Sequence, residues 1–218
     1  MKTIVIASRN PHKVREFQKL LGSRFKYFTL REFSSMPPIQ ETGTTFEENA
    51  RIKAEATANW LLLKRGTDRT LDWAVLGDDS GLEVDALNGD PGLQSARYAS
   101  ADLRISGNAP DAANMAKLIK ALEAVPAEQR TARFRCALAL TEVRSGLPTT
   151  TFAGQCDGVI SAEPRGSQGF GYDPVFIPND FSQTFGELGA DQKDRISHRA
   201  IAISALRDWV TKRYPVTA

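Results

Sequence analysis

The stretch Trp73-Ala74-Val75-Leu76-Gly77-Asp78-Asp79-Ser80-Gly81-Leu82 joins a short apolar run to two adjacent carboxylates, a hydroxyl and a glycine. The apolar run predicts a short buried strand, and Gly77 and Gly81 predict tight backbone bends around the acidic pair. Adjacent carboxylates repel each other unless a cation or a proton lies between them. Mg²⁺ suits them, because it takes one or two carboxylates and completes its shell with water and phosphate. Taken alone, the stretch is better explained as a surface turn, so the argument for a metal site needs evidence from the rest of the chain.

Composition places the chain among ordinary soluble globular proteins. It has 218 residues, of which 41% are hydrophobic and 25% charged, enough for one large domain or two small ones. The net charge of +2 gives no basic field for binding nucleic acid. Cys136 and Cys156 have no CxxC or paired histidine near them, which favours two buried thiols. No segment has the length of a membrane span or a signal peptide, so a cytoplasmic protein is expected.

The N-terminal segment has the pattern of a strand followed by a helix. Residues 3–7 predict a buried strand, and Pro11 and Gly22 mark the start and end of a helix with an apolar face. The intervening loop, residues 8–13, therefore meets a helix N-terminus, where free N–H groups and the helix dipole favour anions. Lys13 adds a full positive charge. The alternative, a capped helix with a solvated lysine, is the better explanation when this loop is considered alone.

A second helix is predicted to begin within residues 41–50, after a strand at residues 25–30. Thr45 and Glu48 have capping-box spacing. Glu41 precedes the helix, where its carboxylate can face a metal, and Lys53 lies on the polar face, where a solvated lysine is the usual alternative. The apolar stripe of this helix consists of Phe46, Ala50, Ala54, Thr57, Ala58 and Leu61.

The second half of the chain predicts strands, one helix and a glycine-rich loop. Residues 131–141 alternate between apolar and polar side chains, which indicates a half-buried strand, and further strands are expected over residues 149–160, paired as an antiparallel hairpin around Gly146. Residues 165–174 contain three glycines with aromatics that we expect to be exposed, so this loop can approach a planar ligand closely. A helix lies within residues 108–126.

The last part of the chain predicts a helix with basic side chains at or near its start. Ser197 is the expected N-cap, which leaves His198 and Arg199 in the first turn. Lys193 lies shortly before them in the sequence.

Five separated segments occur in the order found in one protein family. They are Ser8-Arg9-Asn10-Pro11-His12-Lys13, Glu41-Thr42-Gly43-Thr44-Thr45-Phe46-Glu47-Glu48-Asn49-Ala50, Asp78-Asp79-Ser80-Gly81-Leu82, Gly169-Phe170-Gly171-Tyr172-Asp173-Pro174 and Ile196-Ser197-His198-Arg199. Together they resemble the inosine triphosphate pyrophosphatases, also called Ham1-like proteins, over residues 3 to 212. The chain departs from the family pattern in an apparent loop insertion at residues 64–72 and in Ser8-Arg9, where many members have Thr and a small residue.

The resemblance implies a fold, a reaction and a partner. The implied fold is α/β, a long mixed twisted sheet flanked by helices, with residues 1–218 forming a single domain of two lobes around a central cleft. The implied reaction is Mg²⁺-dependent hydrolysis of dITP, ITP or XTP to the monophosphate and pyrophosphate, which keeps deaminated purines out of DNA and RNA. The implied assembly is a homodimer.

The resemblance also implies roles that the residue chemistry supports. Glu41 and Asp79 hold Mg²⁺, and Asp79 accepts the proton of the attacking water. Phe170 stacks on the base, while donors such as His198 and Arg199 accept a 6-oxo purine and reject adenine, which has an amino group there. Asp173 and Lys193 read the base edge with them; Asn10, Lys13 and Lys53 neutralise the triphosphate; and Ser80 donates to a phosphate oxygen. The full predicted substrate-binding set is Ser8, Arg9, Asn10, Pro11, His12, Lys13, Lys53, Ser80, Phe170, Gly171, Tyr172, Asp173, Lys193, His198 and Arg199.

Three other interpretations are weaker. The Maf-like pyrophosphatases have a related architecture but lack the Ser-His-Arg ending and the Phe-Gly-Tyr-Asp loop seen here. A non-catalytic nucleotide sensor would keep the base contacts and lose the acidic residues, yet Glu41, Asp78 and Asp79 are all present. A single-strand nucleic-acid binder could use Phe170 and Tyr172 as a stacking platform, but the near-neutral charge argues against it.

Overall fold

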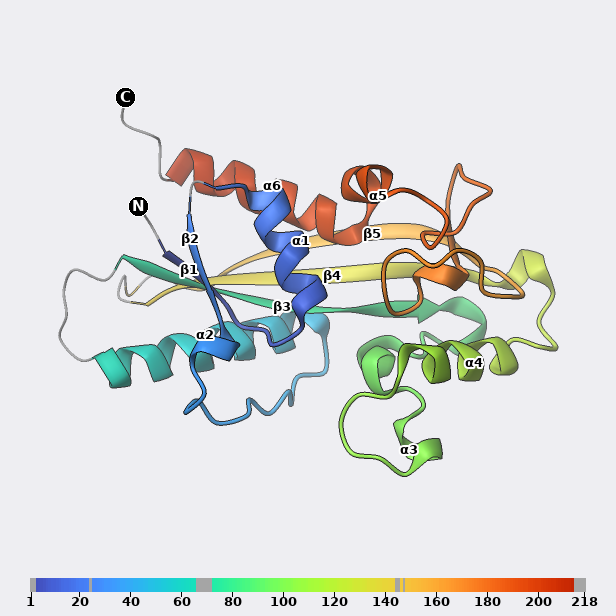
Figure 1. The fold of residues 1–218 in the computed structure, drawn as a ribbon, viewed down its shortest axis with the longest axis horizontal. Coiled ribbons are helices and arrows are strands. Elements are labelled where there is room, and N and C mark those ends of the chain that lie inside the picture. The colour runs from blue at the N-terminus through green and yellow to red at the C-terminus, as the bar shows by residue number, and fades with distance from the viewer. Residues whose placement is uncertain (1–2, 24, 66–71, 144–145, 147, 214–218) are drawn as a thin grey trace. The chain divides into compact units, whose positions relative to one another are not determined.

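The computed structural model describes residues 3–23, 25–65, 72–143, 146 and 148–213. These residues form an α/β structure around one six-stranded sheet (Figure 1). The strands are β1 (Thr3–Ile6), β2 (Lys26–Thr29), β3 (Trp73–Val84), β4 (Thr131–Glu142), β5 (Thr150–Ile160) and β6 (Phe176–Pro178). The helices are α1 (Pro11–Leu21), α2 (Phe46–Arg65), α3 (Ser100–Leu103), α4 (Asp111–Ala121), α5 (Ala190–Ile196) and α6 (His198–Arg213).

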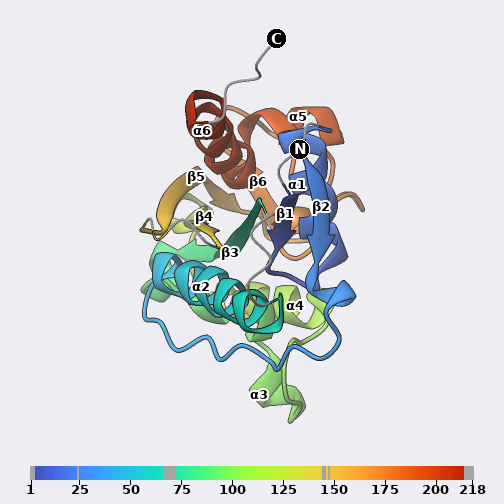
Figure 2. The same ribbon diagram turned by 90° about the vertical axis from the view of Figure 1, so that its left-hand side faces the viewer.

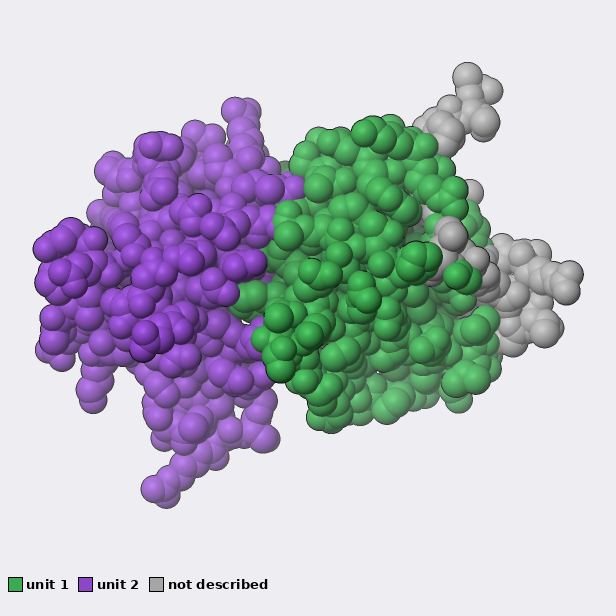
Figure 3. Space-filling view, turned by 180° about the vertical axis from the view of Figure 1, so that it is seen from behind, with its two compact units in different colours: residues 1–79, 136–153, 202–218 green, residues 80–135, 154–201 purple. Residues whose placement is uncertain are grey.

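The sheet is mixed, as the family resemblance implies. Its strand order is β2-β1-β3-β4-β5-β6. β1 pairs in parallel with both β2 and β3, whereas β5 pairs antiparallel with β6. The chain divides into two compact units, of which unit 1 comprises residues 1–79, 136–153 and 202–218, and unit 2 comprises residues 80–135 and 154–201 (Figure 3). The single domain of two lobes with a central cleft stays a prediction.

Unit 1 has helices on both faces of its strands. α1 and residues 202–213 of α6 pack on one face of β1, β3 and β4, and α2 lies on the other (Figures 1 and 2). The apolar segment of β1 is buried along its whole length, and the predicted apolar stripe of α2 is buried too. Gly22 ends α1 with a positive φ of 77°, as the sequence predicts.

The predicted bends around the acidic pair are wrong. β3 continues as one strand from Trp73 through both aspartates to Val84. Gly77 is needed for another reason, because a Cβ there would lie 2.1 Å from the Ala50 carbonyl oxygen of α2. The glycine therefore lets a helix approach the strand closely. The sequence around a glycine does not distinguish this role from a backbone bend.

Unit 2 has its own core, built around an aromatic cluster. The ring of Phe134 on β4 contacts Phe176, with centroids 4.7 Å apart, and Phe185 packs against Phe176 at 5.3 Å. The predicted helix within residues 108–126 is α4, which buries Leu118. The strands predicted over residues 149–160 form the single strand β5.

α2 begins within the predicted residues 41–50, and most of the apparent insertion lies outside the described residues. Thr45 caps α2 by accepting a hydrogen bond from the Glu48 N–H at 3.1 Å, and the Glu48 carboxylate also accepts from the Thr44 N–H at 2.6 Å. Residues 66–71 of the apparent insertion lie outside the described residues. Within the described part of the chain, no helix is long and apolar enough to cross a membrane.

Candidate active site

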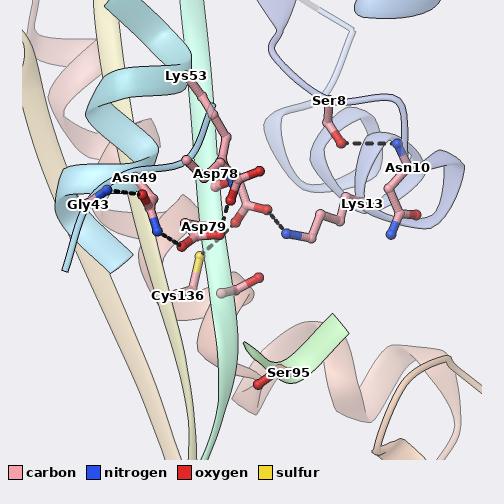
Figure 4. Close-up of polar contacts among 12 residues, drawn as sticks. Ser8, Asn10, Lys13, Gly43, Asn49, Lys53, Asp78, Asp79, Ser95 and Cys136 are labelled. Atoms are coloured by element: carbon pink, nitrogen blue, oxygen red, sulfur yellow. Dashed lines mark hydrogen bonds and ion pairs between the residues drawn. The ribbon is translucent and has the colours of Figure 1, made fainter. Parts of the chain in front are cut away.

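The two adjacent aspartates of β3 point to opposite faces of the strand, as alternating side chains do. The Asp78 carboxylate forms an ion pair with Lys13 on α1 and accepts a hydrogen bond from the Cys136 thiol at 3.4 Å. The Asp79 carboxylate accepts hydrogen bonds from Lys53 at 2.8 Å and from the Asn49 amide at 3.2 Å, both on α2 (Figure 4). The two aspartates therefore have different partners: Asp78 binds a side chain of α1, and Asp79 binds side chains of α2.

Lys53 is the centre of the group on the α2 side. Its ammonium lies 2.8 Å from Asp79 Oδ1, 2.9 Å from Glu41 Oε2 and 3.0 Å from the Asp78 carbonyl oxygen. Burial by itself lowers the pKa of Lys53, but Asp79 and Glu41 outweigh it, so the pKa ends above its ordinary value. The alternative of a solvated lysine is wrong here, because Lys53 is a buried cation that remains charged.

Asp79 is a stronger base than an aspartate in water. Burial raises the pKa of its carboxyl, and the charges of Lys53 and Lys13 reduce this rise without cancelling it. A buried carboxylate held by two donors has a fixed orientation, which general-base catalysis requires.

Asn49 is a member of this group that the sequence analysis did not select. Its amide donates to Asp79, while its oxygen accepts a hydrogen bond from the Gly43 N–H at 2.8 Å. A Cβ on Gly43 would lie 2.8 Å from that oxygen, so the glycine makes room for the contact. One signal was available: Asn49 and Lys53 are four residues apart and share the polar face of α2.

The loop before α1 has internal hydrogen bonds that shape it. The Ser8 hydroxyl accepts from the Asn10 N–H at 3.1 Å, and Pro11 is the first residue of α1. The Arg9 guanidinium donates to the Met36 carbonyl at 3.3 Å, so this side chain also braces a neighbouring loop. The side chain of His12 lies outside the described part of the structure. Lys13 is paired with Asp78, which excludes the solvated-lysine alternative.

Unit 2 brings the predicted base-binding residues together around Phe170. The Asp173 carboxylate, 2% exposed, accepts from the Lys193 ammonium at 2.6 Å and from the Phe170 N–H at 2.7 Å. The same ammonium lies 4.9 Å from the centroid of the Phe170 ring. Gly169 has a φ of 78°, and a Cβ there would lie 2.0 Å from Asp173 Oδ2. This glycine is required both for the turn and for the buried carboxylate that anchors the loop.

The start of α6 supplies the other two predicted base contacts. The Ser197 hydroxyl accepts from the Ala200 N–H at 3.2 Å, which confirms the predicted N-cap. The His198 ring stacks on Phe134 with centroids 4.7 Å apart and an interplanar angle of 11°. The Arg199 guanidinium lies 5.0 Å from the Phe170 centroid and donates to the Ser80 hydroxyl at 2.8 Å.

Tyr172 is not the exposed aromatic that the sequence predicts. Its side chain is 4% exposed, and its hydroxyl donates to the Ser95 carbonyl at 2.9 Å. Burial raises the pKa of this phenol above its ordinary value. The ring belongs to the core of unit 2, so a stacking platform made of Phe170 and Tyr172 together is excluded. Its neighbour Gly171 donates its N–H to Asp111 at 2.7 Å.

Comparison with known proteins identifies the chain at this point. A model of the Ham1 family matches residues 4–209. This protein belongs to the Ham1 family. The dITP/XTP pyrophosphatase of Geobacillus kaustophilus is 48% identical to it over 207 residues, which are 94% of this chain and 93% of the relative. The dITP/XTP pyrophosphatase of Bacillus subtilis is 45% identical, with 94% and 96% of the two chains covered.

Solved Ham1 structures have the same fold. The HAM1 protein of Coxiella burnetii superposes with a TM-score of 0.80 at 40% identity, covering 97% of this chain and all of that one. The Ham1 protein of Staphylococcus aureus also gives a TM-score of 0.80, at 37% identity. The resemblance seen in the sequence and the α/β fold it implies are therefore confirmed.

The donor set of this Ham1 protein fits a metal bound jointly with a substrate. Among the residues described, no group of three or more His, Cys, Asp or Glu side chains could hold a metal on its own. Glu41 and Asp79 nevertheless both lie within 2.9 Å of the Lys53 ammonium, so one cation already sits against the two carboxylates. In a typical Mg²⁺ site the protein supplies one or two carboxylate ligands, and water and phosphate oxygens occupy the remaining coordination positions.

Proposed function

We propose that this protein hydrolyses the deaminated purine nucleotides dITP, ITP and XTP to the monophosphate and pyrophosphate. The observation that carries the proposal is the buried Asp79 carboxylate, held between Lys53 and Asn49 in a chain 48% identical to a dITP/XTP pyrophosphatase. Cleavage between the α- and β-phosphates needs a base, neutralised charge and an oriented water. Unit 1 contains residues suited to each of these tasks.

Asp79 is the proposed general base. One carboxylate oxygen takes a proton from the attacking water as the water oxygen bonds to phosphorus and the bond to the leaving pyrophosphate breaks. Its contacts with Lys53 and Asn49 hold the carboxylate oxygens in place for this transfer.

Lys13 and Lys53 are the proposed ligands of the triphosphate, with Asn10 contributing an amide. Both lysines are paired with aspartates, so their ammonium groups are positioned before the substrate arrives. Glu41 and Asp79 are the residues that would hold Mg²⁺, which supplies positive charge for the polyphosphate. Glu41 has a side chain that is 34% exposed, so it can turn toward a cation without leaving a buried cavity.

Phe170 is the proposed stacking partner of the base, and Lys193, His198 and Arg199 are the proposed donors to its edge. A 6-oxo group accepts hydrogen bonds where adenine offers an amino donor. Facing donors left unpaired by adenine cost about 1–3 kcal/mol each. Asp173 acts on this edge indirectly in the proposal, because its carboxylate already binds Lys193 and Phe170.

The proposal is tested by pyrophosphate release from dITP and from dATP, each with Mg²⁺ and with excess chelator. Fast release from dITP only, and only with Mg²⁺, is expected. Equal rates on both substrates would contradict the assignment of base selectivity, and full activity in chelator would contradict the metal. The proposal includes a homodimer, as the family resemblance implies, and a cytoplasmic location. A solution mass near one subunit would contradict the dimer.

A further inference from the structure

The Ser80 hydroxyl is engaged with a base-binding residue. Its oxygen accepts a hydrogen bond from Arg199 Nη2 at 2.8 Å, across 119 positions of the chain and within unit 2. Arg199 is buried and Ser80 is partly buried, so water competes little for this bond. The sequence predicts Ser80 only as a ligand of a phosphate oxygen. That role by itself does not require a hydrogen bond from Arg199.

Two contacts together restrict the Arg199 guanidinium. The Phe170 ring lies 5.0 Å from its central carbon, which limits how the guanidinium plane can shift. The hydroxyl holds one terminal nitrogen, which limits rotation of the group over the ring. An arginine side chain has many rotamers, so donors reach a fixed position only when such contacts select one of them.

The two cations at the Phe170 ring have different kinds of acceptor. Lys193 is bound to a carboxylate, that of Asp173, whereas Arg199 is bound to a neutral hydroxyl. A carboxylate neutralises the cation that it holds, whereas a hydroxyl fixes the direction of one guanidinium nitrogen without adding a charge. The Ser80 contact therefore orients Arg199 as a donor.

We propose that Ser80 is a positioning residue that sets base selectivity by orienting Arg199. The inference rests on the proposed pyrophosphatase function. Ser80 directly follows Asp79 in β3. The residue proposed to orient Arg199 is therefore the sequence neighbour of the proposed general base. A serine hydroxyl that accepts a hydrogen bond can also donate one, so the contact with Arg199 is compatible with the proposed phosphate contact.

Five variants test the proposal by kcat/KM for dITP and for dATP: Ser80→Ala, Ser80→Thr, Ser182→Ala, Arg199→Ala and the double variant Ser80→Ala/Arg199→Ala. Ser80→Ala removes the acceptor of the Arg199 hydrogen bond. The ratio of kcat/KM for dITP to kcat/KM for dATP is expected to fall about three- to tenfold, because one donor to the base loses its fixed orientation. Ser80→Thr keeps a hydroxyl and is expected to restore most of the ratio. Ser182→Ala removes an exposed hydroxyl of the same unit and serves as the matched control. Ser80→Ala is also made in an Arg199→Ala background, where it should change the ratio less than about twofold.

The outcomes separate positioning from the other roles. An equal loss of kcat/KM on both substrates would assign Ser80 to phosphate binding and overturn the proposal. The same change of ratio with and without Arg199 would also overturn it, because the effect would not pass through the arginine. Calorimetric binding of dIMP and dAMP gives a second readout that needs no turnover, and Ser80→Ala should lower the preference for dIMP there too.

The wild-type protein distinguishes failure of this inference from failure of the proposed function. If wild type prefers dITP to dATP and Ser80→Ala keeps that preference, only the positioning role is wrong. If wild type shows no preference, the proposed substrate class fails and the role of Ser80 fails with it.

Discussion

Replacing Asp79 by Asn removes a charge from the centre of the candidate site and disturbs a defined set of hydrogen bonds. The asparagine oxygen can still accept from Lys53, but its amide then faces the amide of Asn49, so two donors oppose each other. Asn49 cannot rotate to relieve this, because its oxygen is held by the Gly43 N–H at 2.8 Å. One hydrogen bond is lost in either orientation.

The loss of stability follows from these contacts. One hydrogen bond contributes about 1 kcal/mol, and removing one partner of a buried ion pair costs roughly 3–5 kcal/mol when nothing replaces it. Lys53 keeps Glu41 at 2.9 Å and the Asp78 carbonyl at 3.0 Å, which reduces the second contribution. We therefore expect a decrease of about 1–3 kcal/mol in the free energy of unfolding, measured by urea denaturation.

The loss of activity should be much larger than the loss of stability. Removing a general base lowers kcat by a factor on the order of 10² to 10⁴, measured as pyrophosphate release at saturating dITP. Asn49→Ala is the matched control, since it removes the same hydrogen bond and keeps the Asp79 charge; its kcat should fall by less than about tenfold. Asp78→Asn loosens Lys13 and should raise KM more than it lowers kcat. Near-normal turnover in Asp79→Asn, with turnover lost in Asp78→Asn, would refute this division of roles.

Three further predictions concern the metal, the lysines and the packing of α2. Glu41→Gln should abolish Mg²⁺-dependent turnover with the circular dichroism spectrum unchanged, because this side chain is partly exposed; retained turnover would exclude Glu41 as a metal ligand. Lys13→Ala and Lys53→Ala should each raise KM for dITP at least tenfold, roughly the loss of one charged contact, while dIMP affinity measured by calorimetry changes less; unchanged KM in both would remove them from the phosphate site. Gly77→Ala should lower the free energy of unfolding by about 3 kcal/mol or more, because its Cβ would lie 2.1 Å from the Ala50 carbonyl oxygen; urea denaturation with an unchanged midpoint would show that α2 can move away.

The sequence by itself determined the local elements and the family. Three consecutive apolar residues make up most of β1, proline and glycine bound α1, and a serine caps α6, because each signal acts within a few residues of the element it defines. The five motifs also identified the Ham1 family, since their order along the chain needs no coordinates. Asp79 and Lys53 became candidates through these motifs, because local chemistry by itself favours a surface turn and a solvated lysine.

Only the tertiary structure decided what those residues touch. It showed β3 running straight through the acidic pair, Asn49 bound to Asp79, Tyr172 buried in a core and Ser80 holding Arg199. The last three contacts join positions 30, 77 and 119 residues apart. Periodicity and turn signals describe a segment's own backbone, whereas such contacts depend on which faces of distant segments meet, and a glycine that admits a helix has the same local signature as one that makes a bend.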